Sequence, residues 1–511
     1  MSIVKSFLQE GILIEPSLLE FFKNNSITYD IIPIIKSLSI TFLSKQSLFS
    51  NHDRIKFFLE SMKPGKTEEE TKIIQNTIEC FSIFSRKEEK KEKSGGKNDE
   101  KISFKILESW RIPGKKIEVD DFVRYFKARL LALKGILQER AELENLTAIN
   151  KISSQKQNSI SIIGLVSRKD ITKNKNFIIE IEDFTGKIKV LVSCTKEEIY
   201  KKAQRVLLDD VIGMKCSGNS EILFANDIIF PDAFANLKKN EGKEEYAAFI
   251  SDIHLGSSMF LEEEFSRFIN WLNLEKGNDE QKELAKKVKY LFIVGDTIDG
   301  VGVYPGQEDS LKIKDIREQY LKLAEFLGNL RKDIVIFMIP GQHDAVRVAE
   351  PQPPVGEDYA ECLYKIENLN LLSNPSLVEV CGKKILLYHG ASFHNIIDDI
   401  EELRLANAHN NPSKVIKAVL SRRHLAPTHA STTYIPSGDV DPLAIRVVPD
   451  IIATGELHKT DVSIYNNIRI IASSCWQSQT PFEEKVGNFP EPCKVPILNL
   501  KNNSVKIMDF S

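Results

Sequence analysis

The sequence predicts a multidomain α+β protein, with a helical N-terminal domain, a small β-barrel and a C-terminal α/β domain. Three observations lead to this fold class. The chain has 511 residues, enough for three or four domains at about 150 residues each. The spacing of its apolar residues changes from helical to strand-like near residue 158. Beyond residue 246, short apolar runs alternate with helical stretches.

The composition is that of a globular protein and excludes several broad classes. The chain carries 69 Lys+Arg against 72 Asp+Glu, and 42% of its residues are hydrophobic. These values exclude a wholly disordered chain and a uniformly basic DNA-coating protein, but not a local nucleic-acid site. Seven cysteines without a C-x-x-C pair predict a reducing compartment and hence a cytoplasmic protein. No apolar run reaches the roughly 18 residues of a membrane span, and no signal peptide is expected.

Residues 1–85 are predicted to form the helical N-terminal domain. Apolar side chains recur there at helical spacing in two sets: Phe7, Leu8, Ile12, Leu18, Leu19, Phe21 and Phe22, and then Ile32, Ile35, Leu38 and Phe42. Residues 86–101 follow, with dense charge of both signs, a Gly-Gly pair and no apolar side chain. Such a segment cannot bury enough surface to order itself, so it is predicted to be a flexible linker.

Residues 102–155 are predicted to be a helical connecting segment. Its clearest helix lies in DDFVRYFKARLLALKGIL, where Asp120 or Asp121 can cap the start. Residues 156–240 change to short β-rich runs separated by turns, with a helix near 196–207, and this pattern predicts an OB-type barrel. Such barrels often bind single strands. A packing module is an equally good interpretation, because Phe177 and Phe184 are among few aromatic residues available for stacking.

Residues 241–511 are predicted to form the α/β domain. Seven short apolar runs there, bounded by Gly, Pro and polar residues, are typical of buried strands. The runs cover residues 247–250, 290–294, 333–339, 384–388, 450–454, 468–472 and 495–500.

Side chains able to bind metal follow five of these runs. They are Asp252, His254, Asp296, Asp299, Gln342, His343, His389, Glu456 and His458. Because ligands of open α/β sheets gather beyond the carboxyl ends of the strands, these side chains are expected at one rim. A single such histidine is more often structural, but four of the chain's nine lie here, which favours a metal site. Mixed Asp, His and amide ligands suit Mn²⁺, Fe or Zn²⁺ better than Ca²⁺, and Asp296 is the natural bridge between two ions.

The same motifs carry a family resemblance. In chain order they resemble the D-x-H, G-D-x-x-D-G, G-N-H-D, H-G and G-H-x-H motifs of the calcineurin-like metallophosphoesterase superfamily. Residues 300–308 and 345–354, with the preceding OB-like segment, resemble the small subunits of archaeal family D DNA polymerases. The resemblance covers about residues 102–511. It implies a β-sandwich flanked by helices, in a subunit that acts in DNA replication with a large polymerase subunit and primer–template DNA.

The resemblance also implies a role for each of these side chains. The first metal would be held by Asp252, His254, Asp296 and His458, and the second by Asp296, Gln342, His389 and Glu456. His343 would donate a proton to the leaving oxygen or steady the phosphate, and Asp299 would orient His343. In this family such a site supports 3′→5′ exonuclease cleavage. The resemblance implies two divalent ions, with Mn²⁺ the first choice and Mg²⁺, Fe and Zn²⁺ as alternatives.

Two positions depart from the family pattern. Gln342 stands where the family usually has Asn, and Glu456 stands where it usually has His. The first change shifts the reach of the amide, and the second favours harder ions and lowers the Lewis acidity of the second metal. The alternative function is therefore an assembly subunit with a weakened or inactive phosphoesterase site. A free-standing phosphatase is disfavoured, because it would not need the OB-type and helical segments.

Two weaker patterns concern partners. Residues 15–22 resemble a sliding-clamp-binding box with Glu in place of the usual Gln, although a helical core is the more economical interpretation. Arg422 and Arg423 belong to a basic loop that could contact a DNA backbone, with a solvated or subunit-facing loop as an equal alternative.

Overall fold

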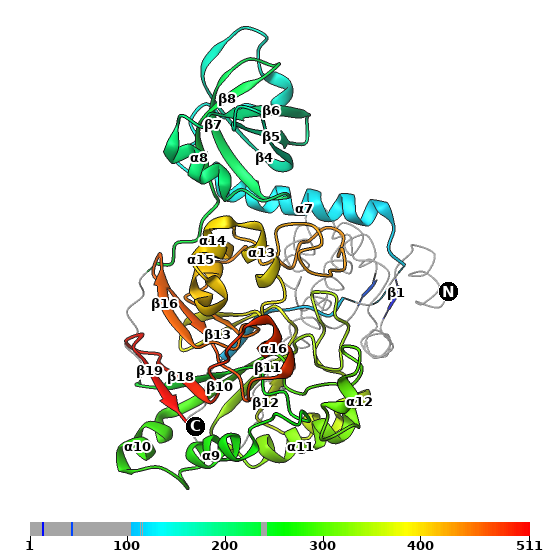
Figure 1. Ribbon diagram of the computed structural model, residues 1–511, viewed down its shortest axis with the longest axis vertical. Helices are drawn as coiled ribbons and strands as arrows, with labels where there is room; N and C mark the ends of the chain where they lie inside the picture. Colours follow the sequence, from blue (N-terminus) through cyan, green and yellow to red (C-terminus); the bar gives the residue numbers. More distant parts are fainter. Residues whose placement is uncertain (1–12, 15–41, 44–103, 113, 115, 237–242) are drawn as a thin grey trace, which may run out of the picture. The chain divides into compact units, whose positions relative to one another are not determined.

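The computed structural model describes residues 13–14, 42–43, 104–112, 114, 116–236 and 243–511 (Figure 1). The chain divides into two compact units, Met1–Lys101 and Ile102–Ser511. In the first unit, strands β1 (Leu13–Ile14) and β2 (Phe42–Leu43) pair in parallel. The helix predicted through Phe42 is therefore wrong at that residue. The rest of the predicted helical domain, the linker and the clamp-binding pattern lie outside the described residues.

The connecting segment contains one long helix and one unpredicted strand. Helix α7 (Val119–Gln138) confirms the predicted helix, and its start is held by the Glu118 backbone N–H, which donates to Asp121 Oδ2 at 3.0 Å. Strand β3 (Phe104–Ser109) precedes it and pairs antiparallel with a strand of the C-terminal domain. The prediction of a helical connecting segment is wrong at these six residues. An edge strand is partly exposed, so its apolar pattern is weak. Such a strand is recognised from its pairing in the folded chain rather than from its own sequence.

Five strands between residues 157 and 229 close into a barrel in the order β4-β5-β6-β8-β7 (Figure 1). Their bounds are β4 (Gln157–Ile171), β5 (Phe177–Glu182), β6 (Lys187–Val192), β7 (Val211–Gly218) and β8 (Leu223–Ile229). Helix α8 (Glu197–Gln204) connects β6 to β7. Alternate residues such as Ile179, Val190 and Met214 point into one apolar core, because successive side chains of a strand face opposite sides.

The C-terminal domain contains two six-stranded sheets. The first has the order β12-β11-β10-β9-β18-β19, and the second has the order β16-β17-β15-β14-β13-β3. The first comprises β9 (Tyr246–Ile250), β10 (Val288–Val294), β11 (Val335–Ile339), β12 (Leu369–Leu371), β18 (Lys494–Asn499) and β19 (Val505–Asp509). The second comprises, besides β3, β13 (Ser376–Val380), β14 (Lys383–Leu387), β15 (Ile451–Thr454), β16 (Asp461–Tyr465) and β17 (Ile468–Ala472).

The two sheets share one apolar core, and their other faces are covered by helices. In β10, Tyr290 and Phe292 belong to the core between the sheets, while Leu291 and Ile293 belong to the core beneath the helices. This two-sided burial explains why the strand is a continuous apolar run. Helices α9 (Glu262–Leu272), α10 (Asp279–Lys287), α11 (Ile316–Gly328) and α12 (Glu357–Tyr364) pack on the first sheet. Helices α13 (Phe393–Asp399), α14 (Glu401–Leu405) and α15 (Pro412–Arg422) pack on the second.

The seven predicted apolar runs all coincide with strands, namely β9, β10, β11, β14, β15, β17 and β18. The strands of these two sheets that were missed are β3, β12, β13, β16 and β19, and four of these five lie at sheet edges. Edge strands expose one face and one row of backbone groups, so their sequences are more polar than those of central strands. The α/β layering is confirmed. Among the described residues, no helix is long and apolar enough to cross a membrane.

The DNA-binding role predicted for Arg422 and Arg423 is wrong, because both side chains are buried, at 2% and 5% exposure. Arg422 Nε lies 3.2 Å from Asp210 Oδ1. The Arg423 guanidinium donates to the backbone oxygens of Ile445 and Arg446 at 2.6 and 2.8 Å. Buried arginines need such partners, and both guanidinium groups here contact other groups of the same chain instead of solvent.

Candidate metal centre

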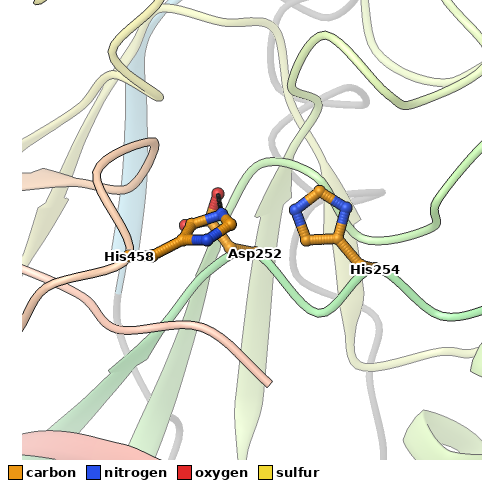
Figure 2. A group of neighbouring side chains, drawn as sticks. All are labelled: Asp252, His254 and His458. Atoms are coloured by element: carbon orange, nitrogen blue, oxygen red, sulfur yellow. Dashed lines mark ion pairs between the residues drawn. The ribbon is translucent and has the colours of Figure 1, made fainter. Parts of the chain in front are cut away.

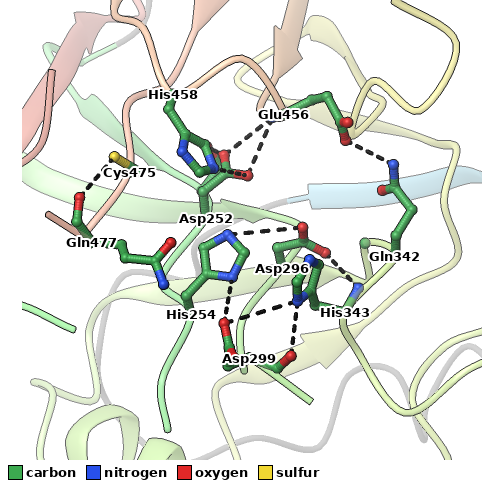
Figure 3. A network of polar contacts seen from close by, with 12 residues as sticks. Asp252, His254, Asp296, Asp299, Gln342, His343, Glu456, His458, Cys475 and Gln477 are labelled. Carbon is green, nitrogen blue, oxygen red and sulfur yellow. Dashed lines mark hydrogen bonds and ion pairs between the residues drawn. The ribbon is translucent and has the colours of Figure 1, made fainter. Parts of the chain in front are cut away.

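The candidate ligands come from the ends of five strands that belong to both sheets. Figure 2 shows Asp252, His254 and His458, and Figure 3 shows them in the wider polar network. Asp252 and His254 follow β9, Asp296 follows β10, and Gln342 follows β11 in the first sheet. His389 follows β14, and Glu456 and His458 follow β15, in the second sheet. The structure therefore brings together all seven side chains that the sequence predicts as ligands, at one edge of the shared core.

Asp252 and Asp296 occupy the middle of the cluster. His389 Nε2 lies 3.2 Å from Asp296 Oδ2 and 3.9 Å from Asp252 Oδ1. His458 Nε2 lies 3.5 Å from Asp252 Oδ1, and His254 Nε2 lies 4.0 Å from Asp296 Oδ2. Three groups of side chains lie close enough to hold a cation: Asp252–His254–His458, Asp252–Asp296–His389 and His254–Asp299–His343.

The polar atoms that face the cluster have the character of metal ligands. Gln342 Oε1, His254 Nε2 and His389 Nε2 are buried and have no hydrogen-bond partner. The opposite nitrogen of each imidazole is engaged, because His254 Nδ1 lies 3.1 Å from Asp299 Oδ1 and His389 Nδ1 lies 2.7 Å from the Val294 backbone oxygen. Donation from Nδ1 leaves the Nε2 lone pair free for a metal. The donor set therefore fits divalent cations.

The charges of the cluster also favour a cation. Burial lowers the pKa of His389, but the carboxylates of Asp296, Asp252 and Glu456 raise it well above the usual value. Burial raises the pKa of Asp296, but His389, His343 and His254 lower it more, so its carboxylate stays ionised. A divalent ion would replace the proton that these carboxylates attract to His389, so ion binding is expected to weaken as the pH falls.

The backbone at these strand ends is strained. Asp252, His254, Asp296, Glu456 and His458 all have positive φ, between 48° and 72°. Residues other than glycine rarely have a positive φ. Such backbone strain is concentrated at functional sites, where the surrounding structure maintains it.

The loop glycines allow the ligands to approach each other, and Gly341 gives a direct test. A Cβ atom at Gly341 would lie 2.1 Å from Asp296 Oδ1 and 2.7 Å from His389 Nε2. We expect Gly341→Ala to displace both groups and to weaken Mn²⁺ binding about tenfold or more, the range seen when metal ligands lose their support. Titration of the full chain with Mn²⁺ measures this. Gly356→Ala is the control, because its Cβ meets no atom within 4 Å, and equal binding by both variants would contradict the geometry.

His343 and Asp299 lie beside the cluster, but their contact differs from the predicted one. His343 Nδ1 lies 2.8 Å from the Asp299 backbone oxygen, and the His343 side chain is 21% exposed. The Asp299 carboxylate is 3.9 Å from His343 Nδ1 but 3.1 Å from His254 Nδ1, and it also accepts from Gln307 Nε2 at 2.9 Å. The orienting group for His343 is therefore the Asp299 main chain, and the carboxylate supports His254.

The two unusual residues contact each other directly. Gln342 Nε2 donates to Glu456 Oε2 at 2.8 Å (Figure 3), and the same oxygen lies 3.3 Å from His389 Nε2. His394, which the sequence reasoning did not single out, lies with Nε2 3.4 Å from Glu456 Oε1. Burial raises the pKa of Glu456, but His394 and His389 lower it to about 2, so Glu456 is an anion at neutral pH.

Sequence reasoning also missed two supporting carboxylates. Asp344 is buried and accepts from the backbone N–H of Gly341 at 2.9 Å, from that of Thr297 at 3.2 Å and from Tyr320 Oη at 3.1 Å. Its position directly after His343 in the sequence could have identified it as part of the site. Glu483, whose Oε1 lies 2.8 Å from His458 Nδ1, follows His458 by 25 residues and has no such signal.

Comparison with known proteins places the chain among polymerase subunits. Residues 247–462 match a family model that describes the B subunits of DNA polymerases alpha and epsilon. The chain is 39% identical to the DNA polymerase II small subunit of Methanothermobacter thermautotrophicus over 77% of this chain and 80% of that protein. It is 37% identical to the Archaeoglobus fulgidus protein of the same name, over 78% of each chain.

Other relatives are longer, and one solved structure is only distantly similar. The DNA polymerase II small subunit of Pyrococcus furiosus is 38% identical over 78% of this chain, which spans 64% of that protein. A solved archaeal phosphodiesterase is 13% identical and covers 52% of this chain and 98% of its own, with a TM-score of 0.26. That likeness is too low to carry an argument.

Proposed function

This chain belongs to the family of DNA polymerase II small subunits, and from that premise we propose that its strand-end cluster is a two-metal 3′→5′ exonuclease centre. The family places the chain in DNA replication. The observation that supports hydrolysis most directly is the set of unpartnered, buried Nε2 and Oε1 atoms around Asp252 and Asp296. Such a set has no evident structural use, since buried polar atoms are ordinarily hydrogen-bonded.

The cluster divides naturally between two ions, for which Mn²⁺ is the first candidate. Asp252, His254 and His458 would hold the first, and Gln342, His389 and Glu456 would hold the second, with Asp296 shared between them. When bound, such a pair of cations activates water and neutralises charge on the phosphate. His254 would be kept in its ligand tautomer by the Asp299 carboxylate.

His343 is the residue proposed to assist the leaving group. Its backbone N–H donates to Asp296 Oδ1 at 2.9 Å, and its Nδ1 is held by the Asp299 backbone oxygen. Both contacts fix the ring beside the cluster while leaving part of it exposed to a substrate. A partly exposed imidazole at this place could donate a proton to the departing 3′ oxygen.

The family membership implies a large polymerase subunit as partner and primer–template DNA as the shared substrate. We further propose that the sandwich is a calcineurin-like phosphoesterase domain and that the barrel is of the OB type. Support comes from the strand-end motifs in the first case, and from the five-stranded closure with a helix between β6 and β7 in the second.

A second function is favoured by one observation. The hydrogen bond between Gln342 and Glu456 occupies two groups proposed for the same ion, which is what an assembly subunit with a weakened site would show. A metal could still displace it, because the Gln342 Oε1 atom is unpartnered and Glu456 is anionic.

One assay separates the two functions. We expect the full chain with Mn²⁺ to release mononucleotides from the 3′ end of single-stranded and mismatched primer DNA, followed with 3′-labelled and 5′-labelled strands. Glu456→His is expected to raise the rate, because a neutral ligand leaves the second ion a stronger Lewis acid. Absence of cleavage in both proteins, with the large subunit present and absent, would establish the assembly function instead.

A further inference from the structure

A buried carboxylate outside the predicted ligand set contacts one of the candidate ligands. Glu483 is 6% exposed and lies in helix α16 (Pro481–Val486). Glu483 Oε1 is 2.8 Å from His458 Nδ1, while His458 Nε2, on the other side of the ring, lies 3.5 Å from Asp252 Oδ1. The imidazole is therefore held between a carboxylate of the candidate centre and a carboxylate behind it.

Glu483 uses both of its oxygens. Besides the His458 contact, Oε1 accepts from Asn488 Nδ2 at 3.1 Å. Oε2 accepts from the Thr480 backbone N–H at 2.9 Å and from Thr480 Oγ1 at 3.0 Å. A buried carboxylate with four partners has a defined orientation, and so has the ring that it contacts.

We infer that Glu483 is a positioning residue of the proposed metal centre. By accepting from His458 Nδ1–H it fixes the tautomer in which the Nε2 lone pair faces Asp252, and it prevents rotation of the ring. A carboxylate behind a histidine ligand also raises the basicity of that ligand. The inference rests on the proposed centre, and it adds a residue from a segment that no strand-end motif identifies.

Glu483 has a second function that an experiment must separate from the first. It is the third residue of α16 in a capping box, in which the Thr480 hydroxyl accepts from the Glu483 backbone N–H at 3.2 Å. Loss of Glu483 could therefore act through the start of the helix alone. Thr480→Ala helps to separate the two, because it removes the capping hydroxyl, while the Glu483 carboxylate keeps His458, Asn488 and the backbone N–H of residue 480 as partners.

The test is equilibrium titration of the full chain with Mn²⁺, with free Mn²⁺ followed by electron paramagnetic resonance. We expect Glu483→Ala to lower the affinity for the first ion, the one assigned to His458, about 10- to 100-fold. This is the usual range for loss of a group that supports a ligand. Glu483→Gln should recover most of this affinity, since its amide oxygen can accept from Nδ1–H. Glu484→Ala, at the exposed neighbour on the same helix, should bind within about twofold of the wild type. Thr480→Ala should lose much less affinity than Glu483→Ala, because it removes only one of the four contacts of the Glu483 carboxylate.

Several outcomes would overturn the inference. Wild-type affinity in Glu483→Ala would do so, and so would a loss in Thr480→Ala as large as in Glu483→Ala. If Glu483→Ala does not fold, Glu483→Met decides, because methionine fills similar space but offers His458 Nδ1–H no oxygen acceptor, and unchanged affinity would then refute the role. A wild type that binds no Mn²⁺ would refute the centre as well. A wild type that binds Mn²⁺ without cleaving DNA would refute only the exonuclease activity. The titrations would then still test the role of Glu483.

Discussion

Asp296→Asn is expected to abolish Mn²⁺-dependent cleavage of 3′ ends, with a fall in rate of about 10³-fold or more. Asp296 Oδ2 lies 3.2 Å from His389 Nε2 and 4.0 Å from His254 Nε2, and it is the carboxylate that we propose to be shared by both ions. An amide of the same shape keeps an acceptor for the His343 backbone N–H but removes the charge that holds the cations together.

The measurement pairs initial rates on 3′-labelled DNA with the Mn²⁺ content of the dialysed protein. We expect the variant to retain at most one ion where the wild type retains two. Asp309→Asn is the matched control, because Asp309 is an exposed carboxylate in the loop after Asp299 and should change neither quantity. A rate within about threefold of the wild type in Asp296→Asn would rule out the shared-carboxylate centre.

Arg129→Met is expected to lower the free energy of unfolding by about 3–5 kcal/mol, the cost of breaking a buried ion pair on one side. Arg129 is 1% exposed, and its Nε lies 2.8 Å from Asp441 Oδ2. The same oxygen is 2.8 Å from His424 Nε2. Methionine fills similar space but leaves the Asp441 carboxylate in the interior without its arginine, with His424 as the remaining partner.

Urea unfolding of the full chain, followed by circular dichroism, measures the change. Arg168→Met provides the control, since Arg168 pairs with Asp170 at 2.6 Å and the two side chains are 70% and 47% exposed. Exposed pairs contribute about 0–1 kcal/mol, so the control should differ little from the wild type. Equal decreases in the free energy of unfolding of the two variants would show that the buried pair contributes no more stability than the exposed one.

The buried pair also predicts a dependence of stability on pH. Burial raises the pKa of Asp441, but His424 and Arg129 lower it more, so that it lies well below the usual value. A carboxyl whose pKa is depressed on folding stabilises the protein fully above its unfolded value of about 4. That contribution is lost as the pH falls further, towards the depressed folded value. The difference between wild type and Arg129→Met should therefore shrink in acid.

The sequence by itself determined the positions of the central strands of the two sheets and the identities of the proposed ligands. A central strand buried on both faces must be a continuous apolar run, as β10 shows, and this signal is local. The placement of these side chains is also set locally, because a residue that directly follows such a run lies at the carboxyl end of the strand. Asp252, Asp296 and His389 are therefore found together, as their motifs predict.

Only the tertiary structure decided burial, side-chain partners and edge pairing, because each depends on residues far along the chain. Arg422 and Arg423 form a basic cluster in sequence, yet Asp210 and the backbone near Ile445 enclose them. Strand β3 is defined by its pairing with β13 rather than by its own pattern. The Asp299 carboxylate supports His254 instead of His343, and Glu483 reaches His458 from a separate helix. A residue's chemistry is a property of its type, but its partner is a property of the folded chain.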